Sequence, residues 1–255
     1  MIKIYLLDFS GAEAQTESFS ALPDFVKNTK NPCLRRQRIF SYMLLFYAYK
    51  EYTKKKNVPA PSLYDNDCLQ KEKINSPSSD KNSINRIPKV ERDRNGRPYF
   101  LDLDIDFNLS HDGEMAALVI SDEGRVGIDI QRHIEDVSQK LKDKASEIYE
   151  NKGIYALLDK DAGLNAEIEC LKYSEGEGLS KENADIVELG QSCDFFSLWT
   201  CIEAISKADG GGLSLLSGID FKDGAFSFLR AGVKDKSKNS YTLFVCAKRS
   251  KKQSN

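Results

Sequence analysis

Apolar residues along the chain gather in short segments that are separated by long polar stretches. Several of these segments are rich in β-branched and aromatic residues, which is typical of strands. Strands are expected at 1–8, near 105–109, at 115–121, at 125–131, and in a C-terminal hairpin over 224–233 and 240–247. Asp122-Glu123-Gly124 predicts a short hairpin turn between the third and fourth of these strands.

Other segments carry the spacing of helices. From Arg36 to about Tyr52, apolar residues recur every three or four positions, which predicts an amphipathic helix. Residues 136–160 are also expected to be helical, and so are residues 194–208, where the triple glycine at 210–212 ends the pattern. Polar stretches near 70–88 and over 160–192 predict loops, the second with a short helix or hairpin. Hairpin strands with helices inserted between them favour an α+β fold over a doubly wound parallel sheet.

Composition narrows the class of protein. The 255 residues allow one large domain or two small ones. The 37 Lys and Arg residues nearly balance 39 Asp and Glu residues, which argues against a generic nucleic-acid binder but leaves room for a local basic patch. The longest apolar run, 42–49, is too short to cross a membrane, and the run 4–7 is too short for a secretion signal. The six cysteines show no CxxC pairing and predict reduced thiols, so we expect a cytoplasmic protein.

The strand at 126–131 displays candidate metal ligands. Side chains alternate along a strand, so Gly127, Asp129 and Gln131 share the face opposite the apolar residues. A carboxylate and an amide oxygen two residues apart suit a hard cation such as Mg²⁺. The alternative is an exposed strand with ordinary polar outer positions.

The helix at 194–208 carries a second polar group. Trp199, Glu203 and Lys207 are spaced by four residues and share one face. An ordinary surface Glu–Lys pair would explain this spacing. The sharper hypothesis joins Glu203 to Asp129 on one metal ion, with Lys207 beside a reacting phosphate. His111 comes at the end of an apolar stretch, which is typical of a strand-end site, although a structural hydrogen-bonding role is the alternative.

Three further patterns do not predict a site. The acidic run 102–106 lacks the glycine and glutamate of an EF-hand loop. The run 110–112 contains Ser, His and Asp, but neighbours on an extended chain point to opposite faces and cannot form a catalytic triad. The run 210–214 is rich in glycine but lacks the ending of a phosphate-binding P-loop.

Four motifs occur in an order and at separations that together are specific. They are Gly96-Arg97-Pro98, Phe107-Asn108-Leu109-Ser110-His111-Asp112, Val126-Gly127-Ile128-Asp129-Ile130, and Trp199-x-x-x-Glu203-Ala204-x-x-Lys207-Ala208 with Gly212-Leu213. With these motifs the chain resembles the 4'-phosphopantetheinyl transferase superfamily, in particular its long, surfactin-synthetase-activating type. The resemblance spans about residues 35–215.

The resemblance implies a fold and a reaction. The long type consists of two similar α+β halves related by a pseudo-twofold axis, here 1–122 and 123–255, with the metal site on the second half. The family transfers the phosphopantetheine arm of coenzyme A to a serine of an apo acyl or peptidyl carrier protein and releases adenosine 3',5'-bisphosphate. Coenzyme A and the carrier protein are then the expected partners, with no nucleic acid and no membrane, and the chain is expected to be a monomer.

The resemblance also implies roles for single residues. Asp129 and Glu203 would ligate Mg²⁺ together with Gln131. The catalytic residues would be Glu203, Lys207 and His111, with Lys207 on the phosphate where it would stabilise or protonate the leaving group. The expected ligands of the coenzyme A phosphates are Arg97, Ser110, His111, Lys207, Arg35 and Arg36. Arg38 belongs to the same basic cluster as Arg35 and Arg36, for which a solvated helix start is the alternative.

Gln131 departs from the pattern of many relatives, which have a glutamate at this position. An amide can ligate a metal through its oxygen but cannot act as a base, which leaves Glu203 or a metal-bound water to deprotonate the carrier serine. Gln131 therefore motivates one alternative, a coenzyme A- or carrier-binding protein with weakened catalysis. An unrelated Mg²⁺-dependent phosphohydrolase is a further alternative.

Overall fold

The computed structural model describes most of the chain. The described residues are 1–13, 22–56, 89–101, 103–152, 163–175, 177–183, 186–187, 194–211 and 226–248. The expected loop near 70–88 and the Gly212-Leu213 part of the last motif lie outside them.

Two larger sheets and one small one contain the strands. The first sheet has the order β4-β5-β1-β7-β8, and the second has the order β6-β11-β10-β9. The first consists of β1 (Ile2–Asp8), β4 (Asp106–Asp112), β5 (Met115–Ser121), β7 (Glu167–Ser174) and β8 (Gly178–Lys181). The second consists of β6 (Val126–Arg132), β9 (Ile186–Val187), β10 (Phe226–Lys234) and β11 (Ser240–Lys248), while β2 (Val90–Arg92) pairs with β3 (Pro98–Phe100).

Most strand pairs are antiparallel, and helices are inserted between them, which is compatible with the predicted α+β fold. The predicted C-terminal hairpin is confirmed as β10 and β11. The predicted hairpin turn at 122–124 is wrong, because β5 and β6 belong to different sheets. The turn instead carries the chain from one sheet to the other.

The polar region 160–192 contains the β7–β8 hairpin, in agreement with one of the two structures expected there. Strand β7 pairs in parallel with β1, which the sequence did not indicate. The buried Lys3 of β1 donates to Glu169 of β7 at 2.8 Å, and the Tyr47 hydroxyl donates to the same carboxylate at 2.8 Å. A buried charged pair that is satisfied in this way explains how a polar strand occupies the interior.

The helices agree with their predicted positions but differ at the ends. Helix α2 (Pro32–Lys56) begins one turn earlier than expected, with proline in its first turn, where a missing N–H costs nothing. Helix α3 (Gln139–Lys152) lies within the predicted range 136–160, the remainder of which is outside the described residues. Helix α5 (Phe195–Asp209) starts at the N-cap Asp194, which accepts from the Ser197 amide, and ends at Gly210 with a φ of 82°. A short helix, α1 (Asp24–Lys27), precedes α2.

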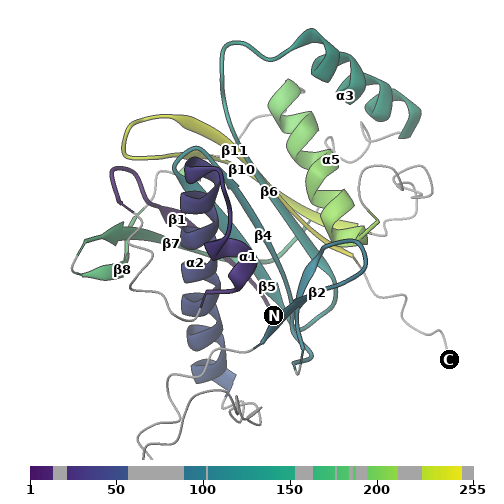
Figure 1. Cartoon of the computed structure of the whole chain (residues 1–255). Coiled ribbons are helices and arrows are strands. Elements are labelled where there is room, and N and C mark those ends of the chain that lie inside the picture. Colours follow the sequence, from purple (N-terminus) through teal and green to yellow (C-terminus); the bar gives the residue numbers. More distant parts are fainter. Residues whose placement is uncertain are drawn as a thin grey trace, which may run out of the picture.

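Three apolar clusters hold the layers together. Helix α2 covers the outer face of the first sheet, and α5 covers the outer face of the second (Figure 1). Alternate residues of β1 and β5 face α2 on one side and strands β6, β10 and β11 on the other. The order is therefore helix, sheet, sheet, helix, with the central core between the sheets. No helix among the described residues is both long and apolar enough to cross a membrane.

The two sheets repeat one topology. In β1–α2–β4–β5, and again in β6–α5–β10–β11, a strand and a long helix precede an antiparallel hairpin whose second strand lies in the middle. Strands β7 and β8 extend the first of these units although they follow β6 in the chain. The pseudo-twofold axis and the division at residue 122 stay predictions.

The edge strands β4 and β6 are joined through side chains. Four polar residues at alternate positions of β4 accept hydrogen bonds from the backbone amides of β6, each from the residue twenty positions ahead. The bonds are Val126 N to Asp106 Oδ2 (2.8 Å), Ile128 N to Asn108 Oδ1 (3.3 Å), Ile130 N to Ser110 Oγ (3.4 Å) and Arg132 N to Asp112 Oδ2 (2.7 Å). The backbone amides at this edge of the second sheet thereby find hydrogen-bond acceptors on the first sheet.

Gly127 determines how closely α5 approaches β6. A Cβ atom at this position would lie 2.0 Å from the Ala204 carbonyl oxygen and 2.6 Å from the Ala208 amide nitrogen. Both contacts are with helix backbone, which has no free rotation to relieve them. Gly127, which shares a strand face with the candidate ligands, thus makes room for the helix that carries Glu203 and Lys207.

Replacing Gly127 by alanine should therefore destabilise the protein, by at least about 2 kcal/mol, because α5 or β6 must shift. Urea denaturation followed by circular dichroism measures the effect. Gly11→Ala is the comparison, because Gly11 has a φ of +72° but no atom within 4 Å of the added Cβ, so it shows a strained backbone without a clash, whereas Gly127 has no positive φ and would show a clash alone. A loss of stability from Gly127→Ala no larger than that from Gly11→Ala would contradict a steric role for Gly127.

Candidate active site

A cavity of about 360 Å³ lies where β4, β6 and α5 meet α1, α2 and the β2–β3 hairpin. Four residues that the sequence singled out from separate motifs line it together: His111 on β4, Asp129 on β6, and Glu203 and Lys207 on α5. Ser110 and Gln131 also line it. The other lining residues are Phe25, Arg38, Ser41, Tyr42, Arg92, Pro98 and Leu109.

Asp129 is the most buried charged group of this cavity. Only 1% of its surface is exposed, since it lies on the face of β6 that α5 covers. Its Oδ1 accepts from Lys207 Nζ at 2.6 Å and from Ser110 Oγ at 2.7 Å, and its Oδ2 accepts from Gln131 Nε2 at 3.0 Å. A buried carboxylate is stable only with such partners.

Lys207 uses its whole hydrogen-bonding capacity inside the protein. Besides Asp129, its ammonium donates to the Ile128 carbonyl at 3.1 Å and to Ser110 Oγ at 3.1 Å. An ammonium group has three donors and no acceptor. In this arrangement no donor of Lys207 is left for a phosphate.

Ser110 is saturated in the same way. Its hydroxyl donates to Asp129 and accepts from Lys207 and from the Ile130 amide, which is one donor and two lone pairs. Only 6% of the residue is exposed. The contacts of Ser110 therefore hold Asp129 and Lys207 together, while its predicted contact with coenzyme A stays a prediction.

Glu203 is the second carboxylate of the cavity. Burial raises its pKa above the ordinary value, the nearby charge of Asp129 raises it further, and Lys207 and Lys144 oppose the shift. A carboxylate whose ionisation is disfavoured by burial and by a second carboxylate nearby is the arrangement that a divalent cation relieves.

His111 is neutral at neutral pH. Burial lowers the pKa of its imidazole, and the positive charges of Lys207 and Arg38 lower it further. A neutral imidazole has one N–H donor and one acceptor nitrogen. It can thus donate a hydrogen bond or accept a proton, but it adds no charge.

A second group of cavity residues consists of Arg38, Tyr42 and Arg92. The sequence had placed Arg38 in the basic cluster at the start of its helix but gave no site role to Tyr42 or Arg92. Among the described residues, neither guanidinium has a carboxylate partner: Arg38 donates to Thr29 Oγ1 at 3.0 Å, and Arg92 donates to the Gly96 carbonyl at 2.8 Å. The buried Tyr42 hydroxyl has no hydrogen-bond partner among them. Burial raises the pKa of Tyr42, and the charge of Arg92 partly offsets the rise. The four-residue spacing of Arg38 and Tyr42 on one helix face was the available signal.

The other predicted basic residues lie elsewhere. Arg35 is exposed and does not line the cavity. Arg36 pairs with Glu114 at 2.6 Å and donates to the carbonyls of Phe9 and Ala12. Neither arrangement supports the predicted contact with a phosphate.

Arg97 is buried and joins three elements. Its guanidinium pairs with Asp106 at 2.5 Å and donates to the carbonyl oxygens of Phe107, Val126 and Lys207. The last of these is one of the unpaired carbonyls at the end of α5, which a basic side chain commonly satisfies. The structure thus gives Arg97 a structural role at this helix end, and its predicted contact with a nucleotide phosphate stays a prediction.

The donor set of the cavity fits Mg²⁺ by its chemistry. Asp129 and Glu203 provide carboxylate oxygens and Gln131 an amide oxygen, which are the hard ligands that this cation prefers. Among the described residues, no three His, Cys, Asp or Glu side chains converge on one point. Mg²⁺ commonly uses one or two carboxylates and completes its shell with water and substrate phosphates.

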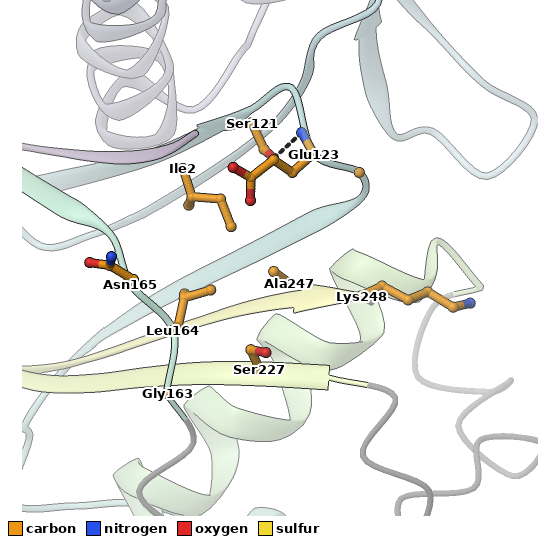
Figure 2. A pocket seen from close by; sticks show the side chains of 10 residues that line it. Ile2, Ser121, Glu123, Gly163, Leu164, Asn165, Ser227, Ala247 and Lys248 are labelled. Carbon is orange, nitrogen blue, oxygen red and sulfur yellow. Dashed lines mark hydrogen bonds between the residues drawn. The ribbon is translucent and has the colours of Figure 1, made fainter. Parts of the chain in front are cut away.

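A second cavity, of about 630 Å³, lies between the ends of β1, β5, β10 and β11. Figure 2 shows Ile2, Leu164 and Ala247 directed into it. Its charged residues have partners elsewhere, because Glu123 pairs with the N-terminal amine and Lys248 pairs with Asp209. It therefore lacks the converging charged groups of the first cavity, which remains the candidate site.

One comparison with known proteins found a partial relative. Over 49 residues the chain is 43% identical to a protein of Haemophilus influenzae named "Putative 4'-phosphopantetheinyl transferase". The match covers 18% of this chain and 21% of that protein, so the two correspond over about a fifth of their lengths. No family model matches the chain. The match supports the resemblance to the 4'-phosphopantetheinyl transferase superfamily.

The raised pKa of Glu203 predicts that, in protein freed of metal, Glu203→Gln is more stable than the wild type at high pH but not at low pH. Because the folded-state pKa exceeds the unfolded one, ionising Glu203 costs stability as the pH rises from its ordinary value of 4.5 through the folded-state pKa. Glu203→Gln removes this cost, so its melting temperature should exceed that of the wild type at pH 8 but not at pH 4. The exposed Glu147→Gln is the control and should show no such difference. A melting temperature below that of the wild type at pH 8 would contradict the assigned shift.

Proposed function

We propose that the chain is a Mg²⁺-dependent 4'-phosphopantetheinyl transferase of the long type, with two α+β halves related by a pseudo-twofold axis. It would transfer the phosphopantetheine arm of coenzyme A to a serine of an apo acyl or peptidyl carrier protein. One observation carries the proposal: Asp129, Glu203, Lys207 and His111, from three separate motifs, line one cavity. The partial match to the Haemophilus influenzae protein supports it independently.

The reaction exchanges one phosphorus–oxygen bond for another. The serine hydroxyl of the carrier attacks the phosphorus that bears the pantetheine arm, and the pyrophosphate bond to the nucleotide breaks. Adenosine 3',5'-bisphosphate leaves with the bond electrons, and the serine proton is released. Such a transfer depends mainly on alignment and on neutralising phosphate charge.

Asp129 and Glu203 would hold Mg²⁺, with the Gln131 amide as a third oxygen ligand. The cation would neutralise charge on the pyrophosphate when bound. Lys207 would contact the same phosphate and stabilise the leaving group. His111 would donate a hydrogen bond to a phosphate oxygen, which its neutral imidazole can do.

Arg38, Tyr42 and Arg92 would bind a further phosphate of coenzyme A. Among the described residues, the two guanidinium groups have no carboxylate partner and the buried Tyr42 hydroxyl has no hydrogen-bond partner. All three side chains line the same cavity. Guanidinium groups match the geometry of phosphate oxygens. Of the basic cluster Arg35, Arg36 and Arg38, we therefore assign the phosphate role to Arg38, and we add Arg92 to it.

Mass spectrometry of an apo carrier protein, incubated with the protein, coenzyme A and Mg²⁺, tests the function. The carrier should gain the mass of the phosphopantetheine arm, and the nucleotide product should appear in equal amount. Asp129→Ala, Glu203→Ala and Lys207→Ala should each slow transfer at least about 100-fold, whereas the exposed Glu147→Ala should not. No transfer to any of several carriers, with tight binding of coenzyme A, would favour the weakened-binder alternative. Full activity of Asp129→Ala would refute the site assignment.

Arg38→Ala should raise the KM for coenzyme A about tenfold with little change in kcat, because the arginine binds the ground state and the transition state alike. Steady-state kinetics at saturating carrier protein measures the split. Arg35→Ala on the same helix is the matched control and should leave both constants unchanged. If Arg35→Ala raised the KM and Arg38→Ala did not, the phosphate subsite would lie at the start of α2 instead.

A further inference from the structure

Lys207 is the counter-charge of Asp129 in the structure. Its ammonium lies 2.6 Å from Asp129 Oδ1 and makes the one ion pair of that carboxylate among the described residues. Lys207 itself is only partly buried, with 26% of its side chain exposed, whereas Asp129 is almost fully enclosed. The lysine can therefore move toward the cavity, while the aspartate is held in place.

Both oxygens of the carboxylate already accept hydrogen bonds, so a second cation would have to join the ammonium on the same buried group. Lys207 and Ser110 contact Oδ1, and Gln131 contacts Oδ2. Ser110 and Gln131 are neutral and can stay beside a cation, but an ammonium and a divalent cation on one buried carboxylate repel each other strongly. The cation and the ammonium must compete for Asp129.

We propose that Lys207 is a resident counter-cation that a divalent metal ion displaces from Asp129. This deepens the proposed function and rests on it. Displacement breaks the contacts of the ammonium with Asp129, Ser110 and Ile128 and so frees its three donors for a phosphate. The lysine becomes available to the substrate only once the metal ion is bound, so metal binding and phosphate binding at this site reinforce each other.

Titration with Mn²⁺, followed by electron paramagnetic resonance and without coenzyme A or carrier protein, tests the competition. Lys207→Met should bind Mn²⁺ at least about tenfold more tightly than the wild type, because no charge-assisted hydrogen bond has to be broken. Lys144→Met is the matched control: it removes the same charge near Glu203 but has no contact with Asp129, and it should change the affinity less than about threefold. Asp129→Asn should abolish tight binding.

Lys207→Gln provides a second neutral variant in case Lys207→Met does not fold, since methionine leaves the buried carboxylate without its charged donor and with only Ser110 and Gln131 beside it. For both variants, Mn²⁺ should raise the melting temperature more than it does for the wild type. Equal or weaker Mn²⁺ binding by the neutral variants would overturn the inference.

The metal titration separates the two proposals. A protein that transfers no phosphopantetheine, but whose Lys207→Met variant binds Mn²⁺ more tightly, refutes the function and supports the role of Lys207. A working transferase whose neutral variants bind Mn²⁺ no better refutes the role of Lys207 alone.

Discussion

The candidate site depends on the way in which two sheet edges meet. Strand β6 pairs with β11 on one side, so every second amide of β6 points away from its own sheet. The polar side chains of β4, from Asp106 to Asp112, accept hydrogen bonds from those amides one after another. This contact replaces a backbone ladder and keeps the two sheets in a fixed register. Because of that register, Ser110 of one sheet lies against Asp129 of the other.

The second constraint is the approach of α5 to the same strand. Gly127 lets the helix backbone touch β6, and Asp194 and Gly210 define where the helix begins and ends. At the C-terminal end, Arg97 and Asn95 donate to the carbonyls of Lys207 and Gly210. These bonds join the helix end to the β2–β3 hairpin and its turn. A helix held at this distance brings the Lys207 ammonium within hydrogen-bond reach of Asp129.

Local patterns predicted the parts of the site that lie on regular elements. The period of two along β6 placed Asp129 and Gln131 on one face, and the period of four along α5 placed Glu203 and Lys207 on another; both predictions are confirmed. The partners of β4 and β7 could not be predicted, because alternating polar residues are equally typical of an exposed face. Nothing in Asp106 or Asn108 indicates that another sheet needs their oxygens, or in Glu169 that Lys3 is buried beside it. The sequence could not tell which member of the basic cluster Arg35, Arg36 and Arg38 lines the cavity, because that depends on which side of α2 faces it, a property of packing.

The charges of the cavity explain why a nearly neutral chain can still suit a polyphosphate. Asp129 and Glu203 lie on β6 and α5, whereas Arg38 and Arg92 come from α2 and β2, so the two signs belong to different walls. Lys207 lies with the carboxylates and is bound to one of them. A cation alone would meet two carboxylates, and an anion alone would meet two arginines. In our proposal, a metal ion together with a phosphate chain would use both walls at once and would also release Lys207. Net charge does not reveal such a site, because the complementary groups cancel in the sum while the fold keeps them apart.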